Sequence, residues 1–239
     1  MLKSSLQALL DFFLPSFCLF CQAPLTPGSE SLACPQCLGE IAGIPQPLCS
    51  CCGAPFRGAV GLEHLCQECL THPPPFSRAR AAAFYDGRVL EAIHRLKYQR
   101  QLIYAKFLGQ LLATSEAASL VAAADLLVPV PLHSRRLRTR GFNQALLLAQ
   151  TFPEVPLGRE VLVRRRPTLP QVKLSPLERQ TNVKGAFMVP DPPAIKDKAV
   201  LLVDDVYTTG ATVKECARAL RRAGVGKVEV ITVARVGYA

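Results

Sequence analysis

Short continuous runs of apolar residues alternate with amphipathic segments through the second part of the chain. The runs have the length and branched composition of buried strands, and they cover residues 79–85, 125–131, 161–166, 200–203 and 227–235. Apolar residues at helical spacing predict helices between them, over residues 88–98 and 101–124, up to Gln150, and up to Gly224. This alternation predicts an α/β fold, with a mostly parallel, doubly wound sheet and a ligand site at the carboxyl ends of its strands.

The amino-terminal residues 2–14 follow a helical pattern of their own, with one apolar face made of Leu2, Leu6, Leu9, Leu10 and Phe13. The apolar run is too short and too interrupted for a signal or membrane segment. We therefore expect an amphipathic helix that docks on the body of the protein, no membrane insertion and a cytoplasmic location.

Nine of the ten cysteines lie before residue 70, and eight of them form four C-x2-C pairs. Each pair can place two thiolates on one tetrahedral zinc ion, and two pairs complete its coordination. We expect about two zinc ions, one held by Cys18, Cys21, Cys34 and Cys37 and the other by Cys49, Cys52, Cys66 and Cys69. Four protein ligands leave no open position for water, so both ions are expected to be structural.

The order of the pairs favours two consecutive zinc ribbons, because the two halves repeat the same pattern. A crossed pairing, with Cys18 and Cys21 joined to Cys49 and Cys52, stays open as the alternative, and Cys51 could be a spectator or replace a neighbouring ligand. Consecutive prolines at 73–75 form a stiff linker. We expect a small zinc-ribbon domain over residues 1–70 and an α/β domain over residues 76–239.

The apolar run at 200–203 leads directly into two adjacent carboxylates, Asp204 and Asp205, and then into a loop of hydroxyl-bearing and small residues. The loop consists of Thr208, Thr209, Gly210, Ala211 and Thr212. Hydroxyls, backbone N–H groups and the start of a helix suit a phosphate, while the carboxylates can accept hydrogen bonds from a diol. Phosphate and diol together indicate a ribose 5-phosphate.

This segment resembles the 5-phosphoribosyl-1-pyrophosphate (PRPP) binding motif of type I phosphoribosyltransferases. The resemblance implies PRPP, with magnesium, at the residues just named. It also implies that the loop after residues 125–131 cradles pyrophosphate and that the polar segment 171–187 is a mobile loop whose Arg179 and Lys184 reach pyrophosphate oxygens. For Lys97 and His94 we expect solvated side chains, with a ligand-facing Lys97 as the alternative.

The chain as a whole is similar to the ComF family of competence-associated, phosphoribosyltransferase-like proteins. The similarity rests on the paired cysteines, the proline linker and Val203-Asp204-Asp205, and on three further motifs: Leu96-Lys97-Tyr98, Val128-Pro129-Val130-Pro131-Leu132 and Arg140-Gly141-Phe142-Asn143-Gln144. It implies a zinc-ribbon domain joined to a type I phosphoribosyltransferase-like domain, and a link to DNA uptake. Three functions follow as alternatives: a pentosyltransferase, a PRPP or nucleotide sensor without turnover, and a single-stranded DNA-handling factor. No residue is assigned a catalytic role, and no acceptor base is indicated.

The net charge of +10 is unevenly distributed, since residues 1–70 hold two basic and five acidic side chains. Basic residues cluster at Arg135, Arg136, Arg138 and Arg140, in a segment expected to be a loop, and at Arg164, Arg165 and Arg166. These clusters predict that a polyanion such as single-stranded DNA would bind the second part of the chain. Competence or DNA-uptake proteins are further expected partners.

Overall fold

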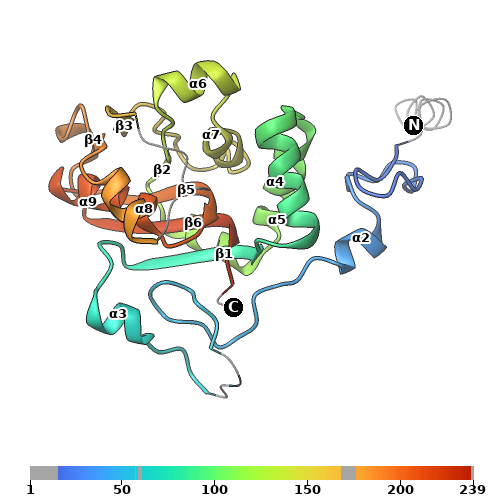
Figure 1. Ribbon diagram of the computed structural model, residues 1–239, viewed down its shortest axis with the longest axis horizontal. Coiled ribbons are helices and arrows are strands. Elements are labelled where there is room, and N and C mark those ends of the chain that lie inside the picture. The colour runs from blue at the N-terminus through green and yellow to red at the C-terminus, as the bar shows by residue number, and fades with distance from the viewer. Residues whose placement is uncertain (1–15, 57, 59–60, 168–175, 238–239) are drawn as a thin grey trace.

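The computed structural model describes residues 16–56, 58, 61–167 and 176–237. Its centre is a parallel sheet in the order β1-β6-β5-β2 (Figure 1). The strands are β1 (Arg78–Phe84), β2 (Leu126–Pro129), β5 (Ala199–Tyr207) and β6 (Lys227–Arg235). A separate antiparallel pair consists of β3 (Val163–Arg164) and β4 (Phe187–Met188).

The helices before β2 are α2 (Pro35–Gly39), α3 (Gln67–Thr71), α4 (Gly87–Gln99), α5 (Ile103–Ala113) and the 3-10 helix η1 (Glu116–Ala123). After β2 come α6 (Ser134–Arg140), α7 (Gln144–Ala149), α8 (Pro176–Val183), the 3-10 turn η3 (Pro193–Ile195) and α9 (Ala211–Arg222). The predicted α/β class and parallel sheet are confirmed.

Side chains alternate between the two faces of the sheet, as the period of a strand requires. On β5, Val200 and Leu202 join a core that includes apolar residues of α9. Leu201 and Val203 point the other way, into a core built with α4, α5, η1 and α7. The sheet is therefore covered on both faces, which explains why its central strands are apolar runs rather than alternating patterns.

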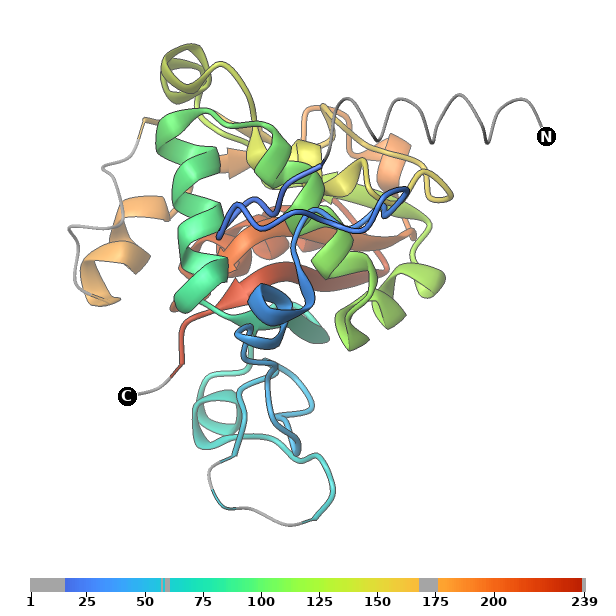
Figure 2. The same ribbon diagram turned by 90° about the vertical axis from the view of Figure 1, so that its right-hand side faces the viewer.

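The two cysteine-rich units join the cores on opposite sides of the sheet. Cys18, Cys34 and Cys37 belong to the core on the α4 and α5 side, where the Tyr104 hydroxyl donates a hydrogen bond to the Leu19 carbonyl (2.8 Å). Figure 2 shows this first unit in blue, in front of the green helices. The second unit joins the α9 side through its cysteines 49, 51, 52 and 69.

The outer edge of β1 is covered by segments of the cysteine-rich region. The Ala79 N–H donates to the carbonyl of Cys51 (2.7 Å), and the Phe84 N–H donates to the carbonyl of Ala42 (3.2 Å). Gly43 and Ala83 form an antiparallel bridge between these points. Segments of the cysteine-rich region thus pair with β1 near both of its ends, on the side away from β6.

Two predicted elements differ in length from the observed ones. The helix expected over 101–124 is interrupted after α5, where the hydroxyls of Thr114 and Ser115 donate to the carbonyls of Gln110 and Leu112. Ser115 adopts an extended backbone, and a 3-10 helix follows. The strand expected over 161–166 is reduced to β3, because only its two residues pair with β4.

The arginine-rich segment that we expected to be a loop is the helix α6. The His133 ring nitrogen Nδ1 accepts a hydrogen bond from the Arg135 N–H and caps its start. Gly141 ends it with φ +89°, a left-handed conformation that favours glycine. Part of the expected mobile loop is likewise helical, as α8, while residues 168–175 lie outside the described part of the chain.

The expected amino-terminal amphipathic helix, residues 2–14, also lies outside the described residues. Among the helices that are described, none combines the length and the apolar character needed to cross a bilayer.

Candidate functional site

A cavity of about 790 Å³ opens at the carboxyl ends of the strands. Its walls come from the end of β5 and the start of α9, from α4, from the segment after β2, and from α6. Chain segments far apart in the sequence therefore meet at the edge where parallel sheets bind ligands. The polar residues in its walls are Tyr85, His94, Lys97, Tyr98, Arg136, Arg140, Gln144, Arg164, Asp204, Asp205, Tyr207, Thr208 and Thr212.

The turn between β5 and α9 is tight. Gly210 has φ +71°, and a Cβ atom at this position would lie 2.6 Å from Cζ of Tyr207. Only glycine fits both the backbone conformation and the close approach of the tyrosine ring. As a result, Thr208, Ala211 and Thr212 line the cavity together with the first turn of α9. Positive helix-dipole charge at that turn favours an anion.

The acidic pair lies at the end of β5 and is nearly inaccessible to solvent, since Asp204 is 8% and Asp205 4% exposed. The Asp205 N–H donates to Oδ1 of Asp204 (2.9 Å). Lys97, on α4, forms an ion pair with Oδ2 of Asp205, and its side chain is 17% exposed. Our expectation of a solvated Lys97 is therefore wrong.

Burial and charge separate the two carboxyl groups. Burial raises the pKa of Asp204 well above its ordinary value, and the negative charge of Asp205 adds to the rise. Burial also opposes ionisation of Asp205, but the charge and hydrogen bond of Lys97 outweigh it and lower the pKa of Asp205. Burial opposes the charge of Lys97 as well, but Asp205 outweighs it and raises the pKa of Lys97. The pair thus contains one stabilised carboxylate and one carboxyl group that readily keeps its proton.

Residues 140–144 form a connected structural unit. Asn143 caps α7 by accepting from the Ala145 N–H (3.1 Å) and donates to the carbonyl of Val130 (3.1 Å), which fixes α7 to the end of β2. Gln144 is buried, and its Oε1 accepts from Nη1 of Arg140 (2.7 Å). This bond holds the guanidinium of Arg140 in the wall of the cavity.

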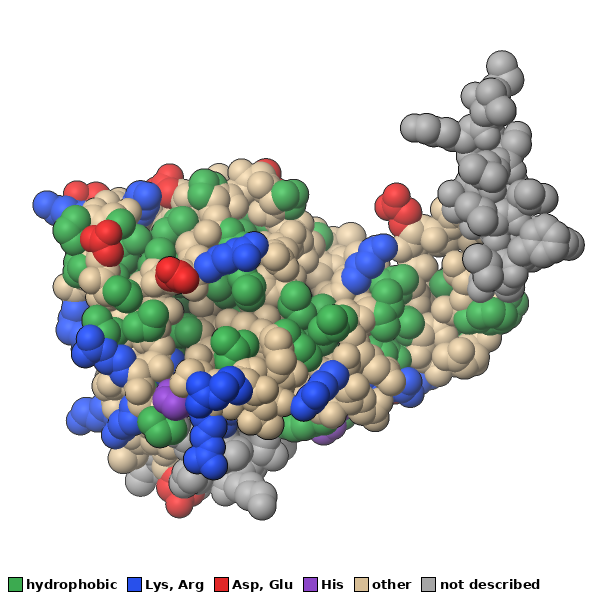
Figure 3. Space-filling model, turned by 90° about the horizontal axis from the view of Figure 1, so that it is seen from above, with side chains coloured by type: hydrophobic (Ala, Val, Ile, Leu, Met, Phe, Trp, Pro, Cys, Tyr) green, Lys and Arg blue, Asp and Glu red, His purple; other side chains and the backbone are tan. Residues whose placement is uncertain are grey.

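Two further arginines, Arg136 and Arg164, share this wall although they are 28 positions apart. Burial lowers the pKa of Arg164, and the nearby charge of Arg136 lowers it further. The guanidinium carbon of Arg164 lies 5.3 Å from the ring centre of Phe187. The two basic clusters noted in the sequence therefore meet at the cavity, the first through Arg136 and Arg140 and the second through Arg164. In Figure 3, Lys and Arg side chains gather around a histidine on the face seen from above.

The structure brings most of the predicted PRPP-binding residues together. Asp204, Asp205, Thr208, Gly210, Ala211 and Thr212 line one cavity. Thr209 is not in its wall, and its hydroxyl accepts from the Ala211 N–H at 3.4 Å. Lys184 is exposed and lines a second cavity beside Lys214 and Glu215. The side chain of Arg179 lies outside the described part of the chain.

Of the α4 residues of the site, only Lys97 was considered from the sequence, as the alternative in which it faces the ligand. His94, Lys97 and Tyr98 are three and four positions apart, so they share one side of the helix. The sequence shows this helical spacing, but side chains that face solvent can have the same spacing. The position of α4 beside β5 distinguishes the two interpretations.

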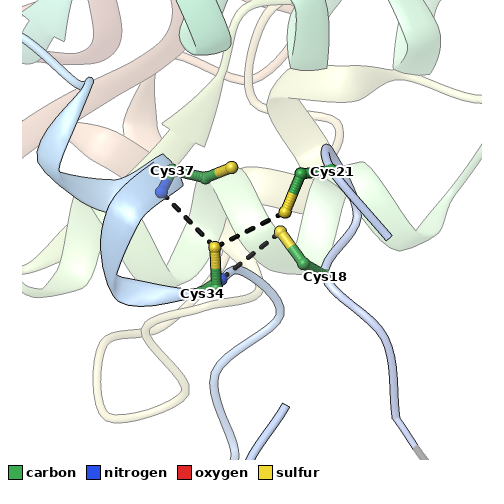
Figure 4. A group of neighbouring side chains, drawn as sticks. All are labelled: Cys18, Cys21, Cys34 and Cys37. Carbon is green, nitrogen blue, oxygen red and sulfur yellow. Dashed lines mark hydrogen bonds between the residues drawn. The ribbon is translucent and has the colours of Figure 1, made fainter. Parts of the chain in front are cut away.

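The four cysteines of the first unit converge (Figure 4). The sulfur atoms of Cys18, Cys21, Cys34 and Cys37 all lie within 4.8 Å of one another. Sγ of Cys21 and Sγ of Cys34 are 3.6 Å apart, close to the edge of about 3.8 Å expected for four thiolates bound 2.3 Å from a tetrahedral zinc. Backbone N–H groups of Cys34 and Cys37 donate to sulfur at 3.3 and 3.5 Å, as suits thiolate ligands.

The second unit repeats this geometry with Cys49, Cys52, Cys66 and Cys69. The Cys66 N–H donates to Sγ of Cys49 at 3.3 Å, as the Cys34 N–H does to Sγ of Cys18. The pairing is consecutive, so the crossed alternative is excluded. Cys51 is outside the cluster, and its thiol faces the carbonyl of Phe76 (3.7 Å). The residues present thus form two four-cysteine sites that fit two structural zinc ions.

Comparison with known proteins agrees with both halves of the chain. A double zinc ribbon domain model matches residues 9–70, and a phosphoribosyl transferase domain model matches residues 137–238. The DNA utilization protein YhgH of Escherichia coli O6:H1 is 35% identical over 92% of this chain and 97% of its own length. Competence protein F of Haemophilus influenzae is 30% identical over 91% of this chain and 96% of its own. A solved allosteric regulatory enzyme of purine biosynthesis is 23% identical over 54% of this chain and 25% of that chain, with a TM-score of 0.35.

Proposed function

Because this chain belongs to the ComF family, in which a double zinc ribbon precedes a phosphoribosyltransferase domain, we propose that its cavity binds PRPP with magnesium and that it transfers the 5-phosphoribosyl group. The observation that carries the proposal is the convergence of three kinds of group in one cavity: the Thr208–Thr212 turn, the buried acidic pair and the arginine wall. A phosphate, a diol and a pyrophosphate need these three kinds of partner.

The 5-phosphate is placed at the turn and first residues of α9, where hydroxyls and the helix dipole favour a dianion. The ribose hydroxyls are placed at Asp204 and Asp205, whose carboxyl groups are held at the end of β5. Pyrophosphate is placed toward Arg136 and Arg140. Magnesium is held in proteins by a few carboxylates and by substrate phosphates, and both would be present at this end of the cavity.

In the proposed reaction, a nitrogen atom of an acceptor forms a bond to C1 of the ribose while the bond from C1 to pyrophosphate breaks. Arg136 and Arg140 would stabilise the charge that accumulates on the departing pyrophosphate. Lys97 holds Asp205 ionised and in place, so the ribose is oriented before the reaction begins. The segment 171–187, with Arg179 and Lys184, is proposed to close over the ligand and exclude water.

The metal sites are proposed to hold structural zinc, because each cluster supplies four thiolates and leaves no open coordination position. Each ribbon has little apolar core of its own, so zinc binding would supply much of its folding free energy.

Calorimetry with PRPP and magnesium tests the proposed function. Asn in place of both Asp204 and Asp205 is expected to weaken PRPP binding at least about 100-fold, since hydrogen bonds to charged groups contribute about 1.5–3 kcal/mol each. Asp191→Asn is a matched control, because Asp191 is exposed and does not line the cavity. A wild-type chain that does not respond to millimolar PRPP would contradict the proposal.

A second candidate function is the handling of single-stranded DNA, in keeping with relatives named for DNA utilization and competence. The observation that favours it is the position of Arg135 and Arg138, which are exposed on α6 beside the cavity. Phosphodiester groups of a strand could contact them while PRPP occupies the cavity. With this second function we also propose DNA-uptake proteins as partners and a cytoplasmic location.

A further inference from the structure

Besides Tyr207 in the turn after β5, three aromatic rings line the cavity, and the proposed PRPP site assigns them no role. They are Tyr85, just after β1, and His94 and Tyr98 on α4. The ring centres of His94 and Tyr98 are 5.2 Å apart at 80°, and those of Tyr85 and His94 are 6.5 Å apart at 51°. The rings form one aromatic cluster at the wall of the site.

We propose that Tyr85, His94 and Tyr98 form a binding site for the planar ring of a nucleobase. The inference rests on the proposed PRPP site, since it assigns the neighbouring part of the same cavity. The base could be a free acceptor or a base of a single strand, and both offer a flat heteroaromatic face. Such faces stack on aromatic side chains with little dependence on sequence.

Position is the first argument. Burial raises the pKa of the Tyr85 phenol, and the charges of Lys97 and Asp205 also act on it, so the phenol lies near the ion pair. If Asp205 holds the ribose hydroxyls, C1 of the ribose lies one bond beyond the 2-hydroxyl carbon. A ring that attacks C1 must then lie beside the acidic pair, where these aromatic side chains are.

Exposure is the second argument. Tyr98 is 61% exposed although it lies on a helix whose other face is well buried. Its ring therefore contributes little to the core, and packing does not account for an aromatic residue there. An exposed ring beside a cavity can instead provide contact area at a small cost in conformational entropy.

Charge is the third argument. Arg140 is close enough to Tyr98 for the phenol to affect its pKa, which burial lowers. The guanidinium of Arg140, held by Gln144, and the acidic pair thus share one cavity with the aromatic cluster. A phosphate or pyrophosphate next to the base would contact Arg140 while the base contacts the rings.

The experiment compares wild type with Tyr98→Ala, Tyr98→Leu and Tyr98→Phe. Leu102→Ala is the matched control, because Leu102 is also exposed near the end of α4 but does not line the cavity. The probes are adenine and uracil by calorimetry, with and without PRPP and magnesium, and labelled 12-nucleotide oligothymidylate by anisotropy. An abasic oligomer of the same length reports phosphate contacts alone.

Tyr98→Ala and Tyr98→Leu are expected to weaken binding of the base-bearing probe roughly tenfold, while Tyr98→Phe and Leu102→Ala retain it. If the Tyr98 variants bind only adenine or uracil more weakly, the ligand is a free acceptor base. If they bind only oligothymidylate more weakly, the ligand is a base of a single strand. Abasic binding and the PRPP response should not change. Equal binding by wild type and Tyr98→Ala, or no base-bearing probe bound by wild type, would overturn the inference. If base binding depends on Tyr98 but the protein does not bind PRPP, the proposed function is contradicted and the base site is supported.

Discussion

Lys97 on α4 and Asp205 on β5 form a buried ion pair that joins the helix to the acidic end of the strand. Lys97→Met leaves a carboxylate without its partner, and Asp205→Asn leaves an ammonium without its partner. Each change is expected to lower the free energy of unfolding by about 3 kcal/mol, as for other broken buried pairs. Urea unfolding measures the change.

The double variant Lys97→Met and Asp205→Asn tests whether the two effects have one origin. It removes both charges, so its loss of stability should be clearly smaller than the sum of the two single losses. Additive losses would show that the two side chains act independently, contrary to the observed pair.

Asp204→Asn is expected to have the opposite effect on stability. Because the pKa of Asp204 is raised in the folded protein, the unfolded chain releases this proton at lower pH than the folded chain does. The free energy of unfolding therefore falls as the pH rises above 3.8, the ordinary pKa of the group. Asn removes this cost and can still accept from the Asp205 N–H. Unfolding at several pH values should show a gain near neutral pH that disappears toward pH 3.8, together with weaker PRPP binding. A gain that is constant across the pH series would rule out this origin.

Zinc content provides a prediction for the two cysteine clusters. Elemental analysis of protein purified without added metal should give two zinc ions per chain, and Cys34→Ser or Cys66→Ser should each lose one. Cys34→Ser should leave the sheet and its site largely folded. A ratio near zero with intact thiols would contradict the assignment.

Arg235 links the second cysteine-rich unit to the turn between β5 and α9. It is 2% exposed, its Nη1 donates to the carbonyl of Cys52 (2.8 Å), and its guanidinium lies over the ring of Tyr207, which packs under Gly210. Arg235→Met should cost about 1.5–3 kcal/mol of stability and weaken PRPP binding. Arg78→Met is the control. Arg78 is partly exposed, and its partner Glu229 retains an ion pair with Lys227 in this variant. If Arg235→Met and Arg78→Met weaken PRPP binding equally, the proposed link between Arg235 and the turn is refuted.

The exposed arginines of α6 predict the salt dependence of DNA binding. Removing Arg135 and Arg138 together should lower the slope of log affinity against log salt by about 1.4, at about 0.7 for each phosphate contact with a single strand. Anisotropy over a salt series measures it, with Lys106→Ala and Arg159→Ala combined as an exposed basic control. An unchanged slope would place the strand elsewhere.

Much of the fold follows from local pattern. The apolar run before Asp204 and the run from Lys227 to Arg235 are strands, because a doubly covered sheet requires apolar residues on both faces. The spacing of the cysteines likewise predicted two four-cysteine sites and favoured the observed pairing, while the crossed pairing was excluded only by the structure. These features depend on neighbours along the chain, which the sequence displays directly.

The rest depends on how distant elements meet. Lys97 has the same helical spacing whether it faces water or Asp205, and only the packing of α4 beside β5 decides. The helix α6 was missed because the arginine-rich segment was interpreted as a loop that cradles pyrophosphate. The capping by His133 and the end at Gly141 are the signals that indicate a helix. The aromatic cluster was missed for the same reason as the position of Lys97. Tyr85 and Tyr98 come from separate elements, and only the packing of those elements brings them together.

The covered edge of β1 has a consequence for behaviour outside the native state. Its outer backbone groups bond to Cys51 and Ala42, which belong to the cysteine-rich segments. If chelation unfolds those segments, a long strand edge with open donors and acceptors is left at the side of an otherwise intact sheet. Such edges pair readily with other chains, so stripping the metal is expected to cause self-association and precipitation before the sheet itself melts.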